Sequence, residues 1–174
     1  MRIAYVCTDP GIPVFGAKGA SIHVQEMVRA FLKLGAEVTL FSPRMDDPVL
    51  ADLTAVRRHP LTPGKPAGKT DAEGRARQQL ALNRVLAEAL EAEGPFDLVY
   101  ERHALFAHGA MDWARGRGIP SILEVNAPLI DEQKQHRSLS CEAEAVEATG
   151  RAMQAAAHVI AVSPAVAEYC AGYG

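Results

Sequence analysis

The sequence predicts an α/β protein with a doubly wound parallel sheet, and three observations lead to this expectation. Short apolar runs rich in β-branched residues recur along the 174-residue chain, and longer segments with helical periodicity alternate with them. Glycine and proline punctuate the boundaries between these segments. Hydrophobic residues make up 48% of the chain, which is enough to bury one sizeable core. Such alternation is typical of parallel strands joined by right-handed crossovers.

The first half of the chain is expected to contain three strands and two helices. Residues 3–7 are a short apolar run with a β-branched and aromatic bias, as in a buried strand. Residues 20–34 repeat apolar side chains at the spacing of one buried helical stripe. Gly94-Pro95 stops the second, longer helix. In order, we expect a strand at 3–7, a helix at 20–34, strands at 37–42 and 56–59, and a helix at 72–93.

The second half continues the alternation with three more strands. A helix closes on Gly118, Pro120 precedes the next strand, and Ser163-Pro164 supplies the N-cap and first residue of the last helix. No linker divides the chain, so residues 1–174 are expected to form a single domain. In order, we expect a strand at 98–100, a helix at 105–117, a strand at 121–125, a polar segment at 131–140 leading into a helix through 157, a strand at 159–162 and a final helix.

The turn between the first strand and the first helix is expected to bind an anion. It places Gly16, Lys18 and Gly19 before a helix whose first turn holds His23. The first amides of a helix lack intrahelical partners and carry the positive end of its dipole, so they can hold a phosphate or a carboxylate. Glycine lets the backbone itself approach such a ligand. Many strand-to-helix turns carry glycine for geometry alone, and that alternative stays open.

The same region disfavours a dinucleotide site. Gly11, Gly16 and Gly19 do not have the G-x-G-x-x-G spacing of a dinucleotide-binding turn. The second strand ends in Ser42-Pro43-Arg44, without the acidic residue that would bind a ribose. The glycine turn is therefore interpreted as a site for a simple anionic group.

Polar residues also follow the fourth and fifth expected strands. Because the carboxyl ends of parallel strands share one edge of a sheet, these residues and the glycine turn should meet there. Glu101 and Arg102 are adjacent, so their side chains point apart, and either could instead serve in a structural salt bridge. A histidine that opens a helix is often just a surface residue, and an asparagine before Ala-Pro could simply complete a turn. The candidates are Glu101, Arg102, His103, Glu124 and Asn126.

Composition excludes several classes of function. The net charge of −3 and the pI of about 6.1 give no reason to expect nucleic-acid binding. No apolar run approaches the roughly 20 residues of a membrane span. The three cysteines lack metal-ligand spacing and are expected to be free thiols of a cytoplasmic protein. Asp46-Asp47 is a poor metal site, and no metal is expected.

Basic residues concentrate between residues 57 and 84. They favour an anionic acceptor or peripheral contact with a membrane surface, and the alternative is an ordinary solvated helix face with a loop. The basic residues are Arg57, Arg58, Lys65, Lys69, Arg75, Arg77 and Arg84, against Asp71 and Glu73.

Several of these segments, in this order, resemble the amino-terminal domain of GT-B glycosyltransferases of family 4. The resemblance covers almost the whole chain, and the order and spacing of the motifs carry it rather than any one of them. They are the stretch from Met1 to Arg44 with Ser21-Ile22-His23-Val24, then Tyr100-Glu101-Arg102, Gly118-Ile119-Pro120, Leu123-Glu124-Val125-Asn126-Ala127-Pro128-Leu129 and His158-Val159-Ile160-Ala161-Val162-Ser163.

The resemblance implies a retaining glycosyltransferase with two Rossmann-like domains around a cleft, of which this chain is one half. Its substrates would be a nucleoside diphosphate sugar and a sugar, lipid or small-molecule acceptor, without a metal ion or another cofactor. The carboxy-terminal domain, which would bind the donor, is expected to be missing from this chain. The implied roles are catalysis by His23, Arg102 and Asn126, donor phosphate binding by Gly16, Lys18 and Gly19, and acceptor binding by Glu101, His103 and Glu124.

Three functional hypotheses follow for the chain. The first is the acceptor-side half of a glycosyltransferase, inactive when isolated. The second is the half of a sugar-nucleotide epimerase of similar two-domain build. The third is a non-catalytic module that binds a phosphorylated sugar. The segments around His23 and at residues 124–128 resemble the transferase more than the epimerase.

Overall fold

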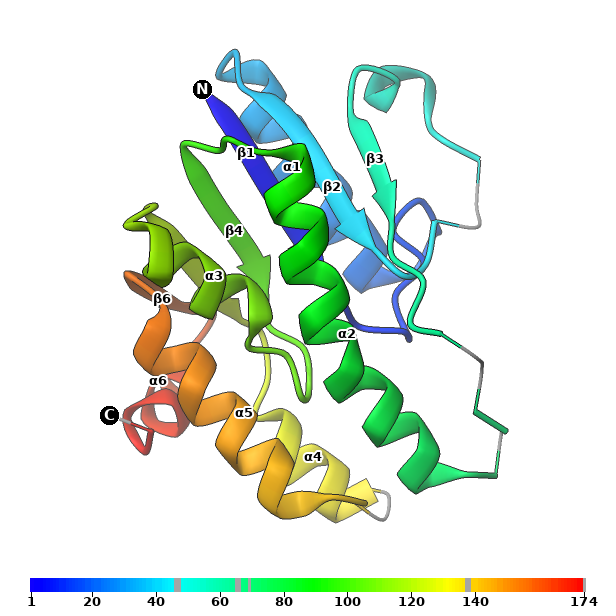
Figure 1. Ribbon diagram of the computed structural model, residues 1–174, viewed down its shortest axis with the longest axis vertical. Helices are drawn as coiled ribbons and strands as arrows, with labels where there is room; N and C mark the ends of the chain where they lie inside the picture. The colour runs from blue at the N-terminus through cyan, green and yellow to red at the C-terminus, as the bar shows by residue number, and fades with distance from the viewer. Residues whose placement is uncertain (46–47, 65–66, 69, 137–138, 174) are drawn as a thin grey trace.

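One parallel sheet forms the centre of the protein. The computed structural model describes residues 1–45, 48–64, 67–68, 70–136 and 139–173. Within them the strands are β1 (Arg2–Cys7), β2 (Glu37–Ser42), β3 (Arg57–Pro60), β4 (Leu98–Arg102), β5 (Ser121–Val125) and β6 (His158–Ala161). Their order is β3-β2-β1-β4-β5-β6, and every neighbouring pair is parallel (Figure 1). The chain winds outward in both directions from the junction of β1 and β4, which confirms the predicted doubly wound fold.

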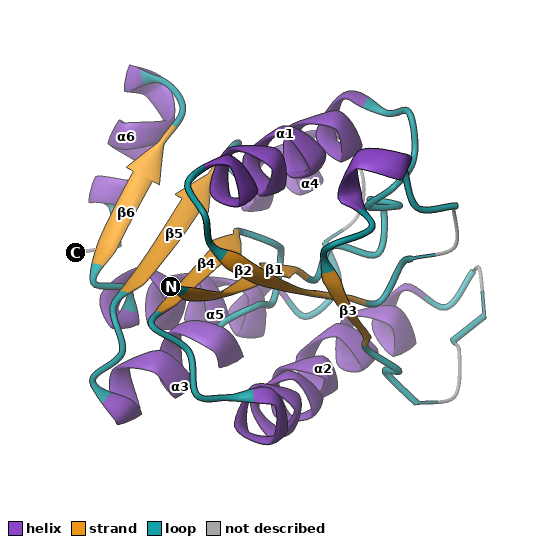
Figure 2. Cartoon of the chain, turned by 90° about the horizontal axis from the view of Figure 1, so that it is seen from above, coloured by secondary structure: helices purple, strands orange, loops and turns teal. Residues whose placement is uncertain are grey.

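Helices cover both faces of this sheet. The helices of the described residues are α1 (Gly19–Lys33), a short 3-10 helix η1 (Ala51–Leu53), α2 (Ala72–Glu93), α3 (Gly109–Arg117), α4 (Leu129–His136), α5 (Glu142–Ala155) and α6 (Pro164–Ala171). Figure 2 shows α1 on one face of the sheet and α2, α3 and α5 on the other. Since both faces of the central strands are covered, these strands appear in the sequence as continuous apolar runs.

Alternate residues of β1 divide the apolar core between the two faces. Tyr5 packs with Val24 and Val28 of α1, whereas Ala4 and Val6 pack with the α2, α3 and α5 side. All five side chains are buried. Full burial of an aliphatic or aromatic side chain contributes about 1.5–3 kcal/mol, so the apolar stripe of α1 is sufficient to hold it on the sheet.

The helix expected at residues 105–117 begins four residues later, at Gly109. The preceding loop contains Phe106, whose backbone is left-handed with a φ of 69°. The side chain of Asn83 on α2 accepts hydrogen bonds of 2.8 Å from the amides of His108 and Gly109. A contact from a distant helix therefore sets where α3 begins, and apolar spacing does not reveal it.

The polar segment expected at residues 131–140 contains a helix that the sequence analysis missed. Helix α4 spans only eight residues, which is too short for a clear helical period. Its buried residue Ile130 packs with Phe106 and Ala145, so the helix is held by this small apolar cluster. The N-cap expected at Ser163 is present, because its hydroxyl accepts a hydrogen bond of 3.3 Å from the amide of Val166.

Candidate functional site

A buried carboxylate near the end of β5 gathers three polar side chains. Oε1 of Glu124 lies 2.6 Å from Nε2 of His23 and accepts a hydrogen bond of 2.5 Å from Nδ2 of Asn126. Oε2 accepts a hydrogen bond from the hydroxyl of Tyr100. Only 3% of the Glu124 side chain is exposed, against 40% of the His23 side chain. These four residues, which we call the Glu124 cluster, satisfy a buried carboxylate and leave part of one imidazole open to solvent.

Aromatic packing holds Tyr100 against the carboxylate. Its ring stacks on Tyr5 at a centroid distance of 5.3 Å and meets Phe31 of α1 edge-on at 5.4 Å. Burial, followed by the hydrogen bond to Glu124, raises the pKa of Tyr100 above its usual range. The hydroxyl therefore stays protonated and donates to Glu124. Tyr100 was not among the predicted site residues, because an aromatic residue inside a strand gives the same signal as a core residue.

The bond to Glu124 orients the imidazole of His23. His23 lies near the start of α1, which follows β1 in the chain. The carboxylate reaches its Nε2 from β5, and β4 separates β5 from β1 in the sheet. A neutral histidine that donates from Nε2 keeps the lone pair of Nδ1 for another partner. His23 is thus directed toward the end of β5, where Asn126 bonds to the same carboxylate.

Strand register places Arg102 on the same face of the sheet as Glu124. The two residues are register partners on β4 and β5, and Cys7 is the partner of Arg102 on β1. Side chains of register partners point to the same face of a sheet. The structure thus brings together the three residues expected to act in catalysis: His23 and Asn126 through hydrogen bonds to Glu124, and Arg102 through register.

Glu101 lies on the opposite face of the sheet, away from this cluster. Its side chain is completely buried, and neither oxygen has a hydrogen-bond partner among the described residues. Burial, followed by the charge of Asp112 on α3, raises the pKa of Glu101 to about 8. Adjacent residues of a strand point to opposite faces, so Glu101 and Arg102 cannot both face the cluster. In this structure Glu101 is not placed to contact an acceptor.

His103 is also buried, although the sequence suggested a surface position at the start of a helix. Only 2% of this residue is exposed, and α3 begins six residues later. Burial, followed by the charge of Arg102, lowers the pKa of His103 to about 4. The side chain is therefore neutral near pH 7. Its main-chain amide donates a hydrogen bond of 2.8 Å to the carbonyl of Glu124, which continues the pairing of β4 and β5 beyond Arg102.

The glycine turn leads into a helix end that no side chain caps. Lys18 is the N-cap residue of α1 without a side-chain cap bond, and the first turn of the helix contains no acidic residue. A Cβ atom added at Gly19 would meet nothing within 4 Å. The buried side chain of Gln25 fixes the turn from within, donating to the carbonyls of Val14 at 3.1 Å and Gly16 at 2.8 Å. The backbone before α1 is therefore held in place by Gln25, and the first amides of the helix are accessible, as anion binding requires.

A pocket of about 480 Å³ opens at the same edge of the sheet. Its walls come from the loops after β1 and β4, from α2 and α4, and from the segment before α5. This volume is typical of a small-molecule site. None of the residues predicted for catalysis, donor binding or acceptor binding lines the pocket, although Arg75 belongs to the basic stretch that was expected to favour an anionic acceptor. The polar residues that line it are Asp9, Arg75, Gln79, Gln133 and Ser140.

Most described arginines of the basic stretch have acidic partners. Arg57 pairs with Glu93 at 3.0 Å, and two arginines of α2 pair with glutamates four residues away. Lys65 and Lys69 lie outside the described residues, as do Asp46 and Asp47. Within the described part of the chain, no group of histidine, cysteine or acidic residues could hold a metal ion, and no helix has the length and apolarity needed to cross a membrane.

Comparison with known families gives one match over most of the chain. A family model described as Glycosyltransferase Family 4 matches residues 17–174. Among curated proteins, the chain is similar to D-inositol 3-phosphate glycosyltransferase 1 of Catenulispora acidiphila, with 31% identity over 120 residues. That alignment covers 64% of this chain and 26% of the relative. The chain therefore spans about a quarter of the length of this curated relative.

Solved structures show the same fold at low sequence identity. Sucrose-phosphate synthase of Thermosynechococcus elongatus matches with a TM-score of 0.65 and 17% identity, covering 98% of this chain and 44% of that chain. A second structure of this synthase matches with a TM-score of 0.57 and 13% identity, covering 97% and 80% of the two chains. The doubly wound architecture is thus the same as that of one part of a larger chain.

Proposed function

This chain belongs to Glycosyltransferase Family 4, and from this membership we propose that it is the acceptor-side half of a retaining enzyme. The enzyme would transfer a sugar from a nucleoside diphosphate sugar to an acceptor hydroxyl. The observation that best supports the proposal is the hydrogen bond that the buried carboxylate of Glu124 accepts from the partly exposed His23, on the helix that follows the glycine turn. Doubly wound sheets bind ligands at this carboxyl edge. A carboxy-terminal domain would complete the enzyme and bind the nucleotide.

The glycine turn would act on the leaving group. In the proposed reaction, the bond between the anomeric carbon and the diphosphate oxygen breaks, and the acceptor oxygen bonds to that carbon. Negative charge builds on the diphosphate as the bond breaks. The uncapped amides of α1, the open backbone at Gly19 and the cationic side chain of Lys18 would stabilise this charge. The proposal needs no metal ion and no cofactor beyond the sugar nucleotide.

The Glu124 cluster would position the acceptor. With Nε2 of His23 held by Glu124, Nδ1 can accept a hydrogen bond from the acceptor hydroxyl and direct its oxygen toward the anomeric carbon. Arg102, the register partner of Glu124, and Asn126, which donates to Glu124, would orient the transferring sugar. Glu124 is too buried to bind the acceptor itself, so its proposed role changes from acceptor binding to positioning of His23.

The pocket at the loops after β1 and β4 would hold the body of the acceptor. Its polar residues are of the kinds that bind sugar hydroxyl groups, and Arg75 adds a positive charge that suits an anionic group. The curated relative acts, by its name, on D-inositol 3-phosphate. We therefore propose a small phosphorylated polyol or sugar as the acceptor. Acceptor contacts are assigned to this pocket rather than to Glu101 and His103, which are both buried.

We further propose where the enzyme acts and how this part of it behaves alone. We place it in the cytoplasm, where sugar nucleotides and phosphorylated polyols are available, and we expect no nucleic-acid partner. Residues 1–174 alone are expected to fold but to show no turnover, since the donor would be held largely by the second domain. The basic stretch gives little support for contact with a membrane, because most of its described arginines pair with acidic side chains.

The test is acceptor-dependent transfer by the complete protein that carries this chain. The enzyme is incubated with UDP- and GDP-sugars, with and without inositol phosphates and hexose phosphates, and nucleoside diphosphate release and the glycosylated product are quantified. Release that requires an acceptor, with product of retained anomeric configuration, supports the proposal. Release without an acceptor together with an epimerised sugar would support the epimerase instead. Binding of a phosphorylated sugar by calorimetry without any turnover would support a non-catalytic module.

A further inference from the structure

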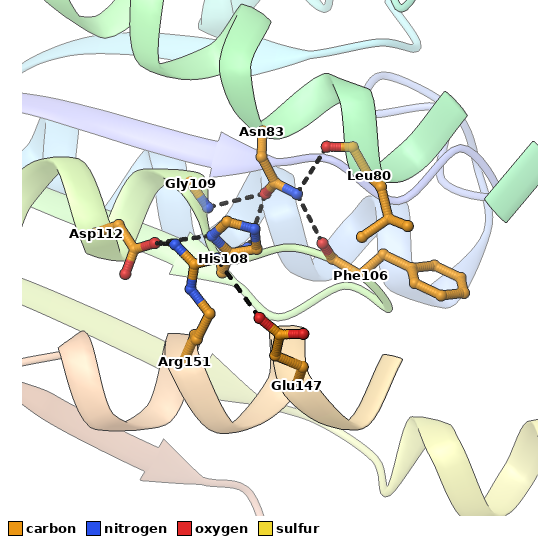
Figure 3. Close-up of polar contacts among 8 residues, drawn as sticks. All are labelled: Leu80, Asn83, Phe106, His108, Gly109, Asp112, Glu147 and Arg151. Carbon is orange, nitrogen blue, oxygen red and sulfur yellow. Dashed lines mark hydrogen bonds and ion pairs between the residues drawn. The ribbon is translucent and has the colours of Figure 1, made fainter. Parts of the chain in front are cut away.

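We infer that Asn83 is a positioning residue for the acceptor pocket, because its side chain fixes the left-handed turn at Phe106 that forms part of the pocket wall (Figure 3). The inference rests on the proposed function, since it assigns the pocket to the acceptor. It adds a residue of α2 that contacts neither the Glu124 cluster nor the glycine turn.

The side chain of Asn83 uses all of its hydrogen-bonding capacity. Nδ2 donates to the carbonyls of Leu80 at 3.0 Å and Phe106 at 2.9 Å, and Oδ1 accepts from the amides of His108 and Gly109 at 2.8 Å each. The residue is buried, with 8% of its surface exposed. One amide group therefore joins α2 to both the turn at Phe106 and the start of α3 (Figure 3). Any replacement that removes part of this set leaves a buried polar group without its partner.

The turn that Asn83 holds is unfavourable on its own. Phe106 has a φ of 69°, a region that non-glycine residues seldom occupy and that bulky residues avoid. Such a conformation persists only where surrounding contacts impose it. The hydrogen bond from Nδ2 of Asn83 to the carbonyl of Phe106 is one such contact. The burial of the Phe106 ring with Ala76, Ile130 and Ala145 is another.

This turn shapes the proposed acceptor site. Leu105 and Phe106 both line the pocket of about 480 Å³, beside Ala76 and Gln79 of α2. Phe106 is 3% exposed, so its ring is fixed between α2, α4 and α5. A change of backbone conformation at Phe106 would move two wall residues at once. The same change would leave His23 and Glu124 in place, because these lie on α1 and β5.

The downstream end of the loop is anchored separately. Nδ1 of His108 lies 2.8 Å from Oδ2 of Asp112, and Arg151 of α5 contacts the same oxygen at 2.5 Å. A Cβ atom added at Gly109 would lie 2.6 Å from the backbone oxygen of Asn83, so α2 and α3 are in close contact there. The start of α3 therefore has supports besides Asn83. The donor side of Asn83 can be altered while α3 stays in position.

Asn83→Asp is the variant that isolates this role. It keeps the shape of the side chain and an oxygen that can accept from the amides of His108 and Gly109, but it replaces the donor to the Phe106 carbonyl by an acceptor. In the complete enzyme, we expect the acceptor KM to rise about tenfold, with kcat and the donor KM changed by less than about twofold, since displaced pocket walls weaken acceptor contacts. Phe106→Gly is the second variant, because glycine accepts the positive φ without strain but lacks the ring.

The matched control is Leu86→Ala, on the same helix and buried in the core away from the pocket. It should lower Tm at least as much as Asn83→Asp but leave the acceptor KM unchanged. If folded Asn83→Asp and Phe106→Gly enzymes keep the wild-type acceptor KM, or if Leu86→Ala raises it equally, the inference is wrong and the proposed function stands. If the wild-type enzyme itself shows no acceptor-dependent transfer, the proposed function fails, and the inference fails with it.

Discussion

Nε2 of His23 lies 2.6 Å from Oε1 of Glu124, although 101 positions separate the two residues in the sequence. The sheet order explains how they meet, since β1, which leads into α1, and β5 are both neighbours of β4. The carboxylate is 3% exposed and the imidazole 40%. A buried carboxylate thus orients a partly exposed imidazole, and this leaves Nδ1 as the ring nitrogen not bonded to Glu124.

The first prediction is that His23 and Glu124 act as one unit. His23→Ala in the complete enzyme should lower kcat about 10²-fold, the scale of a lost positioned proton acceptor. Glu124→Gln should also lower kcat, because its amide nitrogen replaces one of the two accepting oxygens, either the one shared by His23 and Asn126 or the one bonded to Tyr100, and so weakens the network that holds the imidazole. The double variant should lose little more than either single variant. The measurement is kcat for all three, with Tm as the control for folding, and losses that multiply in the double variant would contradict the coupling.

The fold could be predicted because its signals are local. Apolar runs identified five of the six strands of the sheet, helical stripes identified most helices of the described residues, and the alternation of strands with helices indicated parallel pairing. The third strand, at residues 57–60, was placed correctly although its sequence is not apolar. The misplaced start of α3 has a different origin. The first residue of α3 is set by hydrogen bonds to Asn83, which lies more than twenty residues earlier in the chain. No local pattern in residues 105–117 indicates that contact.

The site could be predicted only in part, for a reason that Glu101 and Arg102 illustrate. The sequence made clear that their side chains point to opposite faces of the sheet. It did not show which of the two points toward the site, because helices cover both faces of a parallel sheet. Arg102 shares the face of Glu124, and Glu101 is buried on the other. Tyr100 was missed because the sequence pattern of a tyrosine inside an apolar strand is that of a core residue and does not reveal the partner of its hydroxyl. The pocket was missed because its polar residues come from separate elements with no common motif.

The second prediction concerns the glycine turn. Gly19→Val in the complete enzyme should lower turnover about 10²- to 10³-fold if the side chain displaces one backbone donor from the diphosphate. The fold should survive, because a Cβ at this position meets nothing within 4 Å. Gly116→Val is the matched control, since Gly116 on α3 is equally open and lies outside the proposed site. Steady-state kinetics and circular dichroism are the measurements. Wild-type turnover in a folded Gly19→Val enzyme would show that this glycine serves only the shape of the turn.

The third prediction tests the close contact between α2 and α3. Gly109→Ala should lower the free energy of unfolding by about 1–3 kcal/mol, the usual result of forcing an extra methyl group into packed backbone. The added Cβ would lie 2.6 Å from the backbone oxygen of Asn83. Gly116→Ala on the same helix should instead raise it by up to about 1 kcal/mol through helix propensity. Urea unfolding of both variants measures the difference, and equal effects would mean that the two helices can separate without cost.

The fourth prediction concerns the dependence of stability on pH, which Glu101 and His103 influence in opposite directions. Burial raises the pKa of Glu101 from 4.5 to about 8, so between these values only the unfolded chain loses the proton and stability falls as pH rises. Burial lowers the pKa of His103 from 6.5 to about 4, so between these values only the unfolded chain binds the proton and stability increases as pH rises. The two contributions oppose each other below pH 6.5, and only that of Glu101 continues above it.

Glu101→Gln should therefore change the slope of the pH profile from about pH 4.5 to 8, and the change is clearest between about pH 6.5 and 8, where His103 no longer contributes. Across this interval the wild-type protein should lose on the order of 2 kcal/mol of unfolding free energy through Glu101, at about 1.4 kcal/mol for each pH unit. Asp112, whose charge adds to the raised pKa of Glu101, stays in place in the variant. The variant cannot ionise at this position, so its profile should be flatter above pH 6.5, and below pH 6.5 the rise from His103 should appear without the opposing fall from Glu101. Urea unfolding at half-unit intervals from pH 5 to 8.5 measures both profiles. Parallel curves above pH 6.5 would mean that water or a rearranged side chain solvates the Glu101 carboxylate in the folded protein.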